Sequence, residues 1–295
     1  MYIDGVFSGG GIKGFALIGA LQAIEERGLL FRQLAGTSAG AVIAAFIVAG
    51  YTSHEIFNIM NETELEDLLD ERRTFLPSGL TKWFCLYWRL GLYKGEKLEK
   101  WLECKLKERG IHTFADLPHH SLRIIASDLT NGKIMVLPDD LPQYGISPHT
   151  FSVAKAIRMS CSLPYFFEPV KLKSPKAGAS IVVDGGVLSN FPMWLFDSDT
   201  RPKVRPVLGI KLNPKEEERE KNHIKNAIDL FGALFETMKD AHDARHISTR
   251  HEKNIIFLPV NQVLLTEFQL SEEKKLELIE LGKEQTCRFL EQWSC

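Results

Sequence analysis

The chain has 295 residues, of which 44% are hydrophobic and 25% charged, a composition typical of a globular protein with room for one large α/β domain or two small ones. Its formal net charge of −2 and its scattered Lys and Arg residues argue against nucleic acid as a partner. The five cysteines are odd in number and lack Cys-x-x-Cys spacing, which favours reduced thiols over a disulfide framework.

The first residues and the length of the apolar runs indicate where the protein is located. Asp4 and several glycines stand where a signal peptide has a basic region followed by an apolar run. The longest apolar stretch, residues 39–51, is too short to cross a bilayer. We therefore expect a soluble, cytoplasmic protein that can still contact a membrane peripherally. Its oligomeric state is not predicted.

The first predicted unit is a strand, a glycine-rich turn and a helix. Residues 3–7 are apolar and run into Ser8-Gly9-Gly10-Gly11-Ile12-Lys13-Gly14, after which residues 15–27 have the periodicity of an amphipathic helix. Adjacent glycines leave main-chain N–H groups uncovered, and such groups bind anions, whether a phosphate or the oxyanion of a reacting ester. Gly9, Gly11 and Gly14 also match the Gly-x-Gly-x-x-Gly of dinucleotide-binding proteins, so two interpretations are open here.

The second unit, residues 31–50, contains Gly36-Thr37-Ser38-Ala39-Gly40, which has the glycine spacing of a nucleophile elbow. In such a turn the serine lies at a strained strand-to-helix reversal, and small flanking residues let the backbone bend and a substrate approach. The apolar residues 39–50 predict a buried helix whose free N–H groups would lie beside the Ser38 oxygen. Ser38 is therefore the candidate nucleophile.

Strands and helices alternate along the rest of the chain. Strands are predicted at residues 122–126, 133–137, 179–183, 204–212 and 255–260, and helices at residues 53–73, 95–109, 150–160, 224–250 and 272–293. Asn131-Gly132 predicts a hairpin between the first two of these strands. The strand at 179–183 delivers Asp184-Gly185-Gly186 at its end. The alternation predicts a mainly parallel sheet covered by helices.

Residues 75–93 are dominated by bulky apolar and aromatic side chains, including Trp83 and Trp88. Such a segment either fills a core or faces lipid, because Trp and Tyr suit the boundary between water and hydrocarbon. We hypothesise that it forms the wall or lid of an acyl-binding cleft, and that Trp83 and Trp88 contact the substrate there.

Three motifs in this order resemble one family. The glycine-rich loop at residues 9–14, the elbow at residues 36–40 and Asp184-Gly185-Gly186 are similar to the oxyanion loop, nucleophile elbow and acid motif of the patatin-like phospholipases. The resemblance covers roughly residues 5–195, with residues 196–295 expected to pack on the same domain. It implies a three-layer α/β/α hydrolase fold with a mainly parallel central sheet. Many family members carry Asp where this chain has Ser8.

The resemblance also implies the chemistry. Ser38 and Asp184 form a catalytic dyad without histidine, the N–H groups of Gly10 and Gly11 bind the oxyanion, and Gly9 shapes the loop. The implied function is hydrolysis of carboxylic esters of phospholipids or other acyl lipids, with no metal or organic cofactor. The residues agree with this, since a carboxylate within reach of a serine hydroxyl can accept its proton as the bond to carbon forms.

Two alternative functions follow from the residues. A Ser-His-Asp esterase requires a histidine after the acid in chain order, and His223, His242, His246 and His251 are available. A nucleotide-binding module would use the glycine-rich loop. The second strand of such a module should end in an acidic residue for the ribose, and here it ends in the elbow motif instead.

Other polar residues have weaker claims to a site. His242 and His246 lie four residues apart, which is a metal-ligand spacing, yet Asp243 replaces the Glu of His-Glu-x-x-His and we expect no metal there. Lys13 is expected to be a solvent-exposed lysine at a helix start rather than a phosphate contact. Arg158 could pair with a carboxylate inside the fold, and Cys161 has no neighbouring residue that would activate it.

Overall fold

The computed structural model describes residues 1–70, 85–174, 178–197, 205–212, 224, 227–246, 252–260 and 270–293. Its strands are β1 (Tyr2–Phe7), β2 (Leu30–Thr37), β3 (Gly91–Tyr93), β4 (Leu122–Asp128), β5 (Lys133–Leu137), β6 (Tyr165–Phe167), β7 (Val170–Ser174), β8 (Gly178–Asp184), β9 (Val207–Leu212) and β10 (Ile255–Leu258). Its longer helices are α1 (Phe15–Glu26), α2 (Ala39–Val48), α3 (Ser53–Glu62), α5 (Glu96–Lys107), α6 (Val153–Ser160), α7 (Ala227–His246) and α9 (Glu272–Gln292). None of the described helices combines the length and the apolar composition that a membrane crossing needs.

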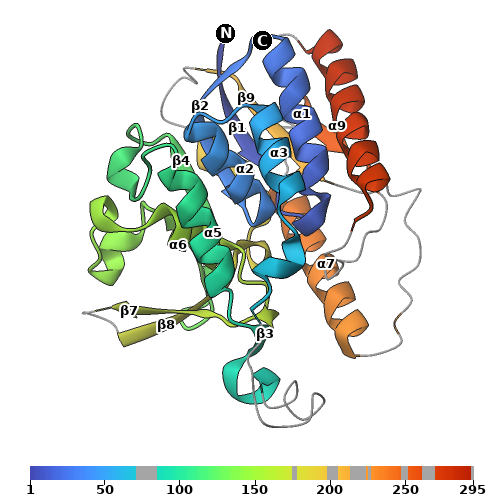
Figure 1. Cartoon of the computed structure of the whole chain (residues 1–295). Helices are drawn as coiled ribbons and strands as arrows, with labels where there is room; N and C mark the ends of the chain where they lie inside the picture. Colours follow the sequence, from blue (N-terminus) through green and yellow to red (C-terminus); the bar gives the residue numbers. More distant parts are fainter. Residues whose placement is uncertain are drawn as a thin grey trace.

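One mixed sheet forms the central layer (Figure 1). Its strand order is β10-β9-β1-β2-β4-β8-β7, and β5 pairs with β4 outside this path. The five strands from β10 to β4 are parallel, whereas β5, β8 and β7 run antiparallel to their partners. The predicted α/β class is therefore confirmed, with a parallel half that carries both predicted motifs at the ends of β1 and β2.

The predicted hairpin joins β4 to β5. The pairing extends from Asp128 opposite Lys133 to Ile124 opposite Leu137, and Gly132 in the turn has a φ of 62°. Two features had no sequence signal: β7, which pairs antiparallel with β8, and a separate two-stranded sheet of β3 and β6. These strands are too short, or alternate with too many lysines, to show an apolar period.

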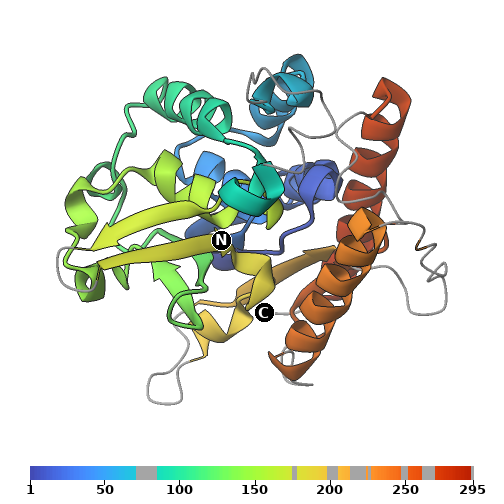
Figure 2. The same ribbon diagram turned by 90° about the horizontal axis from the view of Figure 1, so that it is seen from below.

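Helices lie on both sides of the sheet (Figure 2). The side chains of Ile3 and Phe7 in β1 belong to the core on the side of α1, α2 and α9. Val6, which points to the other face because strand side chains alternate, packs in a separate cluster with Phe191 and Met193 of the segment around the short helix Met193–Phe196. The predicted three-layer arrangement is confirmed.

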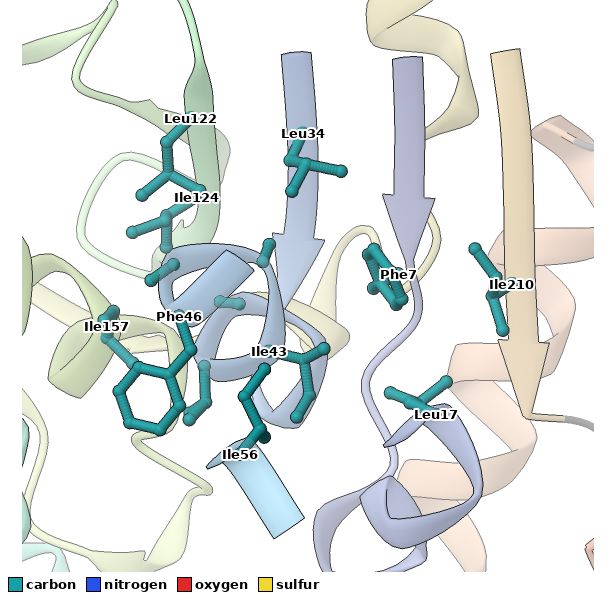
Figure 3. Close-up of a cluster of buried hydrophobic side chains, with 14 of the residues drawn as sticks. Phe7, Leu17, Leu34, Ile43, Phe46, Ile56, Leu122, Ile124, Ile157 and Ile210 are labelled. Carbon is teal, nitrogen blue, oxygen red and sulfur yellow. The ribbon is translucent and has the colours of Figure 1, made fainter. Parts of the chain in front are cut away.

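The main core lies between the sheet and α2 (Figure 3). α2 has almost no polar residue, as expected of a helix that is buried on nearly all sides. Its Ile43 and Phe46 point into a cluster that receives Leu17 from α1, Leu34 from β2 and Ile157 from α6. This packing fixes the start of α2, which is also the elbow.

α1 and α9 pack against each other at two glycines. A Cβ on Gly19 of α1 would lie 1.9 Å from the main-chain oxygen of Ile279, and a Cβ on Gly282 of α9 would lie 2.0 Å from that of Ala16. Glycine at both positions therefore sets the distance between the two helices, and α9 is held directly against the helix that follows the glycine-rich loop.

We predict that Gly282→Ala destabilises the protein by roughly 1–3 kcal/mol or more, because the new methyl group forces two backbones apart. Gly232→Ala in α7 is the matched control, because a Cβ there meets nothing within 4 Å. We expect this variant to be more stable than the wild type by roughly 0.5–1 kcal/mol, since alanine favours a helix over glycine. Urea unfolding of both variants measures the difference. Equal stability of Gly282→Ala and the wild type would contradict the close packing.

Candidate active site

Ser38 lies between β2 and α2 with a φ of 53° and a ψ of −123°. A positive φ is strained for any residue except glycine, and neighbouring glycines make it sterically possible here. A Cβ on Gly36 would lie 2.4 Å from the Gly40 oxygen, and a Cβ on Gly40 would lie 2.4 Å from the Phe7 oxygen. The backbone comes so close to both glycines of the predicted elbow that no side chain fits at either position.

The elbow is also held by a serine that the sequence analysis did not single out. The N–H of Ser38 donates a hydrogen bond to Ser160 Oγ at 2.8 Å, and Ser160 Oγ donates to the Ile125 oxygen at 2.5 Å. Ser160 is fully buried at the end of α6. Ser160 therefore links the strained turn to β4 and α6, and it provides the Ser38 N–H with a hydrogen-bond acceptor.

Asp184 ends β8 and is buried beside Ser38. Its Oδ1 accepts a hydrogen bond from the N–H of Gly186 at 2.7 Å, and its carboxyl lies close enough to Ser38 for the serine hydroxyl to lower its pKa. Burial has the larger effect and raises the pKa of the Asp184 carboxyl from 3.8 to about 6, although the Gly186 hydrogen bond, the Ser38 hydroxyl and the positive charge of Lys239 act in the opposite direction. The carboxyl is thus more basic than an exposed aspartate and still mostly ionised at neutral pH.

Arg158 supports the segment that leads to Asp184. Its buried guanidinium donates to the main-chain oxygens of Gly95 at 2.9 Å and Glu168 at 2.8 Å, and to Ser162 Oγ. The main-chain oxygen of Ser162 accepts a hydrogen bond from the N–H of Asp184 at 2.9 Å. The sequence suggested a carboxylate as the partner of Arg158. In these hydrogen bonds the acceptors are main-chain and hydroxyl oxygens instead.

The glycine-rich loop lies directly against Ser38. A Cβ on Gly9 would be 3.2 Å from Ser38 Cβ and 2.6 Å from Asn190 Oδ1, so no larger residue fits. The N–H of Gly9 donates to the Asn190 oxygen at 3.3 Å. Gly10 and Gly11 follow, and Gly11 has a φ of 58°. The structure thus brings the predicted loop, Ser38 and Asp184 together.

Ser8 holds the same loop to β9. Its Oγ accepts a hydrogen bond from the N–H of Leu212 at 2.9 Å, and its own N–H donates to the Ile210 oxygen at 3.1 Å. A buried hydroxyl therefore anchors the start of the glycine-rich loop.

A cavity of about 150 Å³ opens beside Ser38 and Asp184. Its walls are mostly apolar and come from α1, α2, α3, α5, β6 and α7, with Val42, Trp101 and Phe235 among the larger side chains. Gly10, Gly11 and Asn190 lie at its polar end together with Ser38 and Asp184. The arrangement suits a substrate with a long apolar part and one polar reacting group.

Two lysines and a thiol surround the polar end. Lys239 is buried, lines the cavity and forms an ion pair with Glu236 at 2.6 Å. Lys13 is half-buried, and burial lowers its pKa, so the expectation of an exposed lysine is wrong. Burial and the charge of Asp184 raise the pKa of the Cys161 thiol, which lines the cavity. A thiol held protonated is a poor nucleophile.

Several predicted residues fall elsewhere or outside the described chain. Trp83 lies outside the described residues, whereas Trp88 is 67% exposed and does not line the cavity. No described histidine lines the cavity: His242 is half-buried on α7, His223 and His251 lie outside the described residues, and so does the side chain of His246. Within the described part of the chain, no cluster of three or more His, Cys, Asp or Glu could hold a metal ion.

Comparison with known proteins identifies the family. The model of the patatin-like phospholipase family matches residues 5–197. The chain belongs to this family. An uncharacterized protein of Bacillus subtilis, YqhO, is 60% identical over 294 residues and covers the whole of both chains. A probable lipid hydrolase of Invertebrate iridescent virus 6 is 27% identical over 194 residues, which are 64% of this chain and 61% of the viral one.

Solved structures share the fold. VipD from Legionella pneumophila superposes with a TM-score of 0.58 and 18% identity, over 99% of this chain and 67% of VipD. ExoU from Pseudomonas aeruginosa superposes with a TM-score of 0.54 and 19% identity, over 99% of this chain and 52% of ExoU. The patatin fold predicted from the motifs is confirmed, and the family match places the protein in a family of lipid hydrolases.

We predict that Asp184→Asn makes the protein more stable than the wild type at neutral pH. A carboxyl whose pKa is 3.8 unfolded and about 6 folded loses stability as the pH rises from 4 to above 6, by an amount on the order of 3 kcal/mol. Asparagine has no proton to lose there and can still accept from Gly186. Thermal unfolding of both proteins from pH 4 to 8 checks this, and a constant difference in Tm would refute it.

Proposed function

We propose that the protein is a serine lipid acyl hydrolase, of the phospholipase A or lysophospholipase kind, that acts through Ser38 and Asp184. The observation that carries the proposal is the placement of Ser38, in its strained turn, and the buried Asp184 side by side on the wall of one mostly apolar cavity. Family membership supports hydrolysis of a lipid, and the apolar walls suit an acyl chain.

In the proposed reaction, Ser38 Oγ attacks the acyl carbonyl carbon while Asp184 accepts the hydroxyl proton. The carbonyl electron pair moves to oxygen, and the N–H groups of Gly10 and Gly11 stabilise this oxyanion. The intermediate collapses to an acyl-enzyme as Asp184 returns the proton to the departing alcohol. Water, deprotonated by Asp184, then attacks the ester, and the fatty acid leaves while Ser38 regains its proton.

The strained elbow and the raised pKa of Asp184 both serve this scheme. The turn presents Ser38 Oγ to the cavity, and a carboxylate with a pKa of about 6 is a better proton acceptor than an ordinary aspartate with a pKa near 3.9. The chain's own groups make every proton transfer, so we expect activity without added metal or cofactor.

We predict that a fluorophosphonate probe labels the protein at Ser38, because an activated hydroxyl beside oxyanion donors attacks phosphorus as it attacks carbon. Ser38→Ala should abolish both labelling and ester hydrolysis. Asp184→Asn should fold and lose roughly 10³-fold or more in kcat, since the two side chains act as one unit. Peptide mapping and hydrolysis of a lipid mixture measure these effects.

The histidine variants are the controls for this prediction. Separate Ala substitutions of His223, His242, His246 and His251 should leave most activity intact. A loss equal to that of Ser38→Ala in one of them would replace the dyad with a Ser-His-Asp triad. Labelling of a different serine, or full activity of a folded Ser38→Ala protein, would refute the proposal that Ser38 is the nucleophile.

We also propose that the protein docks on lipid surfaces through a rim patch of Tyr87, Trp88, Leu90 and Tyr165. All four are exposed, with Tyr87 at 63% and Trp88 at 67%. The patch borders the cavity, because β3 directly follows Leu90, Gly91 of β3 pairs with Tyr165 of β6, and the next two residues of β6 line the cavity wall. Trp and Tyr are stable at the boundary between water and hydrocarbon.

We predict that replacing Tyr87 and Trp88 together with Ser weakens vesicle binding about tenfold or more, since burying one large apolar side chain is worth roughly 1.5–3 kcal/mol. Hydrolysis of long-chain lipids should fall in parallel, while short soluble esters and the Tm stay near wild-type values. Tyr2→Ser removes an aromatic side chain that is 51% exposed at the start of β1 and should change neither. Unaltered vesicle binding of the double variant would show that the rim patch is not the lipid-binding surface.

A further inference from the structure

One side of α7 faces the catalytic centre. Phe235, Lys239 and Asp243 are spaced by four residues, so they lie along one face of the helix. All three are buried, with Asp243 only 2% exposed. Phe235 and Lys239 line the cavity, and Asp243 lies one turn further along, against β9 and the segment that follows Asp184. The matched family region ends at residue 197, before this helix.

Asp243 is held by an ion pair that is itself buried. Its Oδ2 lies 3.0 Å from Nζ of Lys211, which is 5% exposed near the end of β9. Two charges removed from water are stable only when their geometry satisfies both, so the pair fixes α7 relative to the end of the sheet. Lys211 stands between Ile210 and Leu212, the two residues that hold Ser8 by hydrogen bonds.

The same carboxylate oxygen orients Asn190. Asn190 Nδ2 donates to Asp243 Oδ2 at 3.4 Å. An amide side chain has one donating and one accepting end, so giving its nitrogen to Asp243 turns its oxygen toward the glycine-rich loop. That oxygen lies 2.6 Å from where a Cβ on Gly9 would be, and the Asn190 main-chain oxygen accepts the Gly9 N–H at 3.3 Å. Asn190 therefore contacts Gly9 through both its main chain and its side chain.

We propose that Asp243 is a positioning residue for the oxyanion loop. It fixes the amide of Asn190, Asn190 fixes Gly9, and the N–H groups of Gly10 and Gly11 are thereby held where the oxyanion forms. Through Lys211 the same carboxylate links Asn190 to the strand that anchors Ser8, so both flanks of the loop depend on it. This inference rests on the proposed hydrolysis through Ser38 and adds a helix outside the matched family region to the catalytic machinery.

The first test is Asp243→Asn, which keeps the size of the side chain and presents Asn190 and Lys211 with a neutral amide. We expect kcat for a soluble ester to fall roughly 10- to 100-fold, because a displacement of about 1 Å at a reacting centre costs up to ~10²-fold. KM should stay within about twofold, since the acyl-binding walls are unchanged. The rate of fluorophosphonate labelling of Ser38 should fall with kcat.

The second variant separates positioning from stability. Lys211→Met combined with Asp243→Leu replaces the buried ion pair with apolar side chains, an exchange that is often neutral or stabilising. We expect a Tm near that of the wild type together with the loss in kcat, because leucine at position 243 offers Asn190 no acceptor. A purely structural ion pair would differ in kcat, which would then stay near the wild-type value together with the Tm.

Asp4→Asn is the matched control. Asp4 is a buried aspartate at the other end of β1, where its carboxylate pairs with Arg205 at 2.9 Å. The variant should lose stability and keep kcat. Wild-type kcat in either the Asp243→Asn protein or the double variant would overturn the positioning role of Asp243. A wild-type protein without esterase activity or Ser38 labelling would instead refute the proposed function, so the two failures are distinguishable.

Discussion

Close packing of backbone against backbone at the elbow is the constraint on which the rest of the site depends. Ser38 keeps a positive φ only because Gly40 sits against the main chain that follows β1 and Gly36 sits against the start of α2. The apolar α2 is pressed into this position by the core, and Ser160 holds the turn from the other side. Stability gained in the core thus maintains local strain at the reactive serine.

Burial of charge is the second feature of the site. Asp184 is kept in a place where its ionised form is unfavourable, and the resulting rise in pKa makes it a stronger base. The Gly186 hydrogen bond, the neighbouring Ser38 hydroxyl and the charge of Lys239 limit that rise, so the carboxylate remains available at neutral pH. The same environment that costs stability supports proton transfer.

The proposed catalytic centre includes residues from two parts of the chain. Residues 5–197, which match the family, supply the loop, the serine and the aspartate. β9 and α7 lie beyond residue 197 and add Leu212 against Gly10, the ion pair of Lys211 with Asp243, and the cavity-lining side chains of Phe235 and Lys239. The glycine-rich loop therefore contacts both the region that matches the family and the part of the chain that follows it.

The local units could be predicted from the residues alone. Glycine spacing identified the loop and the elbow, the Asn131-Gly132 turn predicted the hairpin, and apolar periods placed the helices and longer strands, because these features depend on residues close together in the chain. The positions of Ser160, Asn190 and Asp243 beside the site, the half-burial of Lys13 and the exposure of Trp88 depend on the tertiary structure. Ser38 and Asn190 are brought together by strand order and helix packing, which leave no periodic trace in a single sequence.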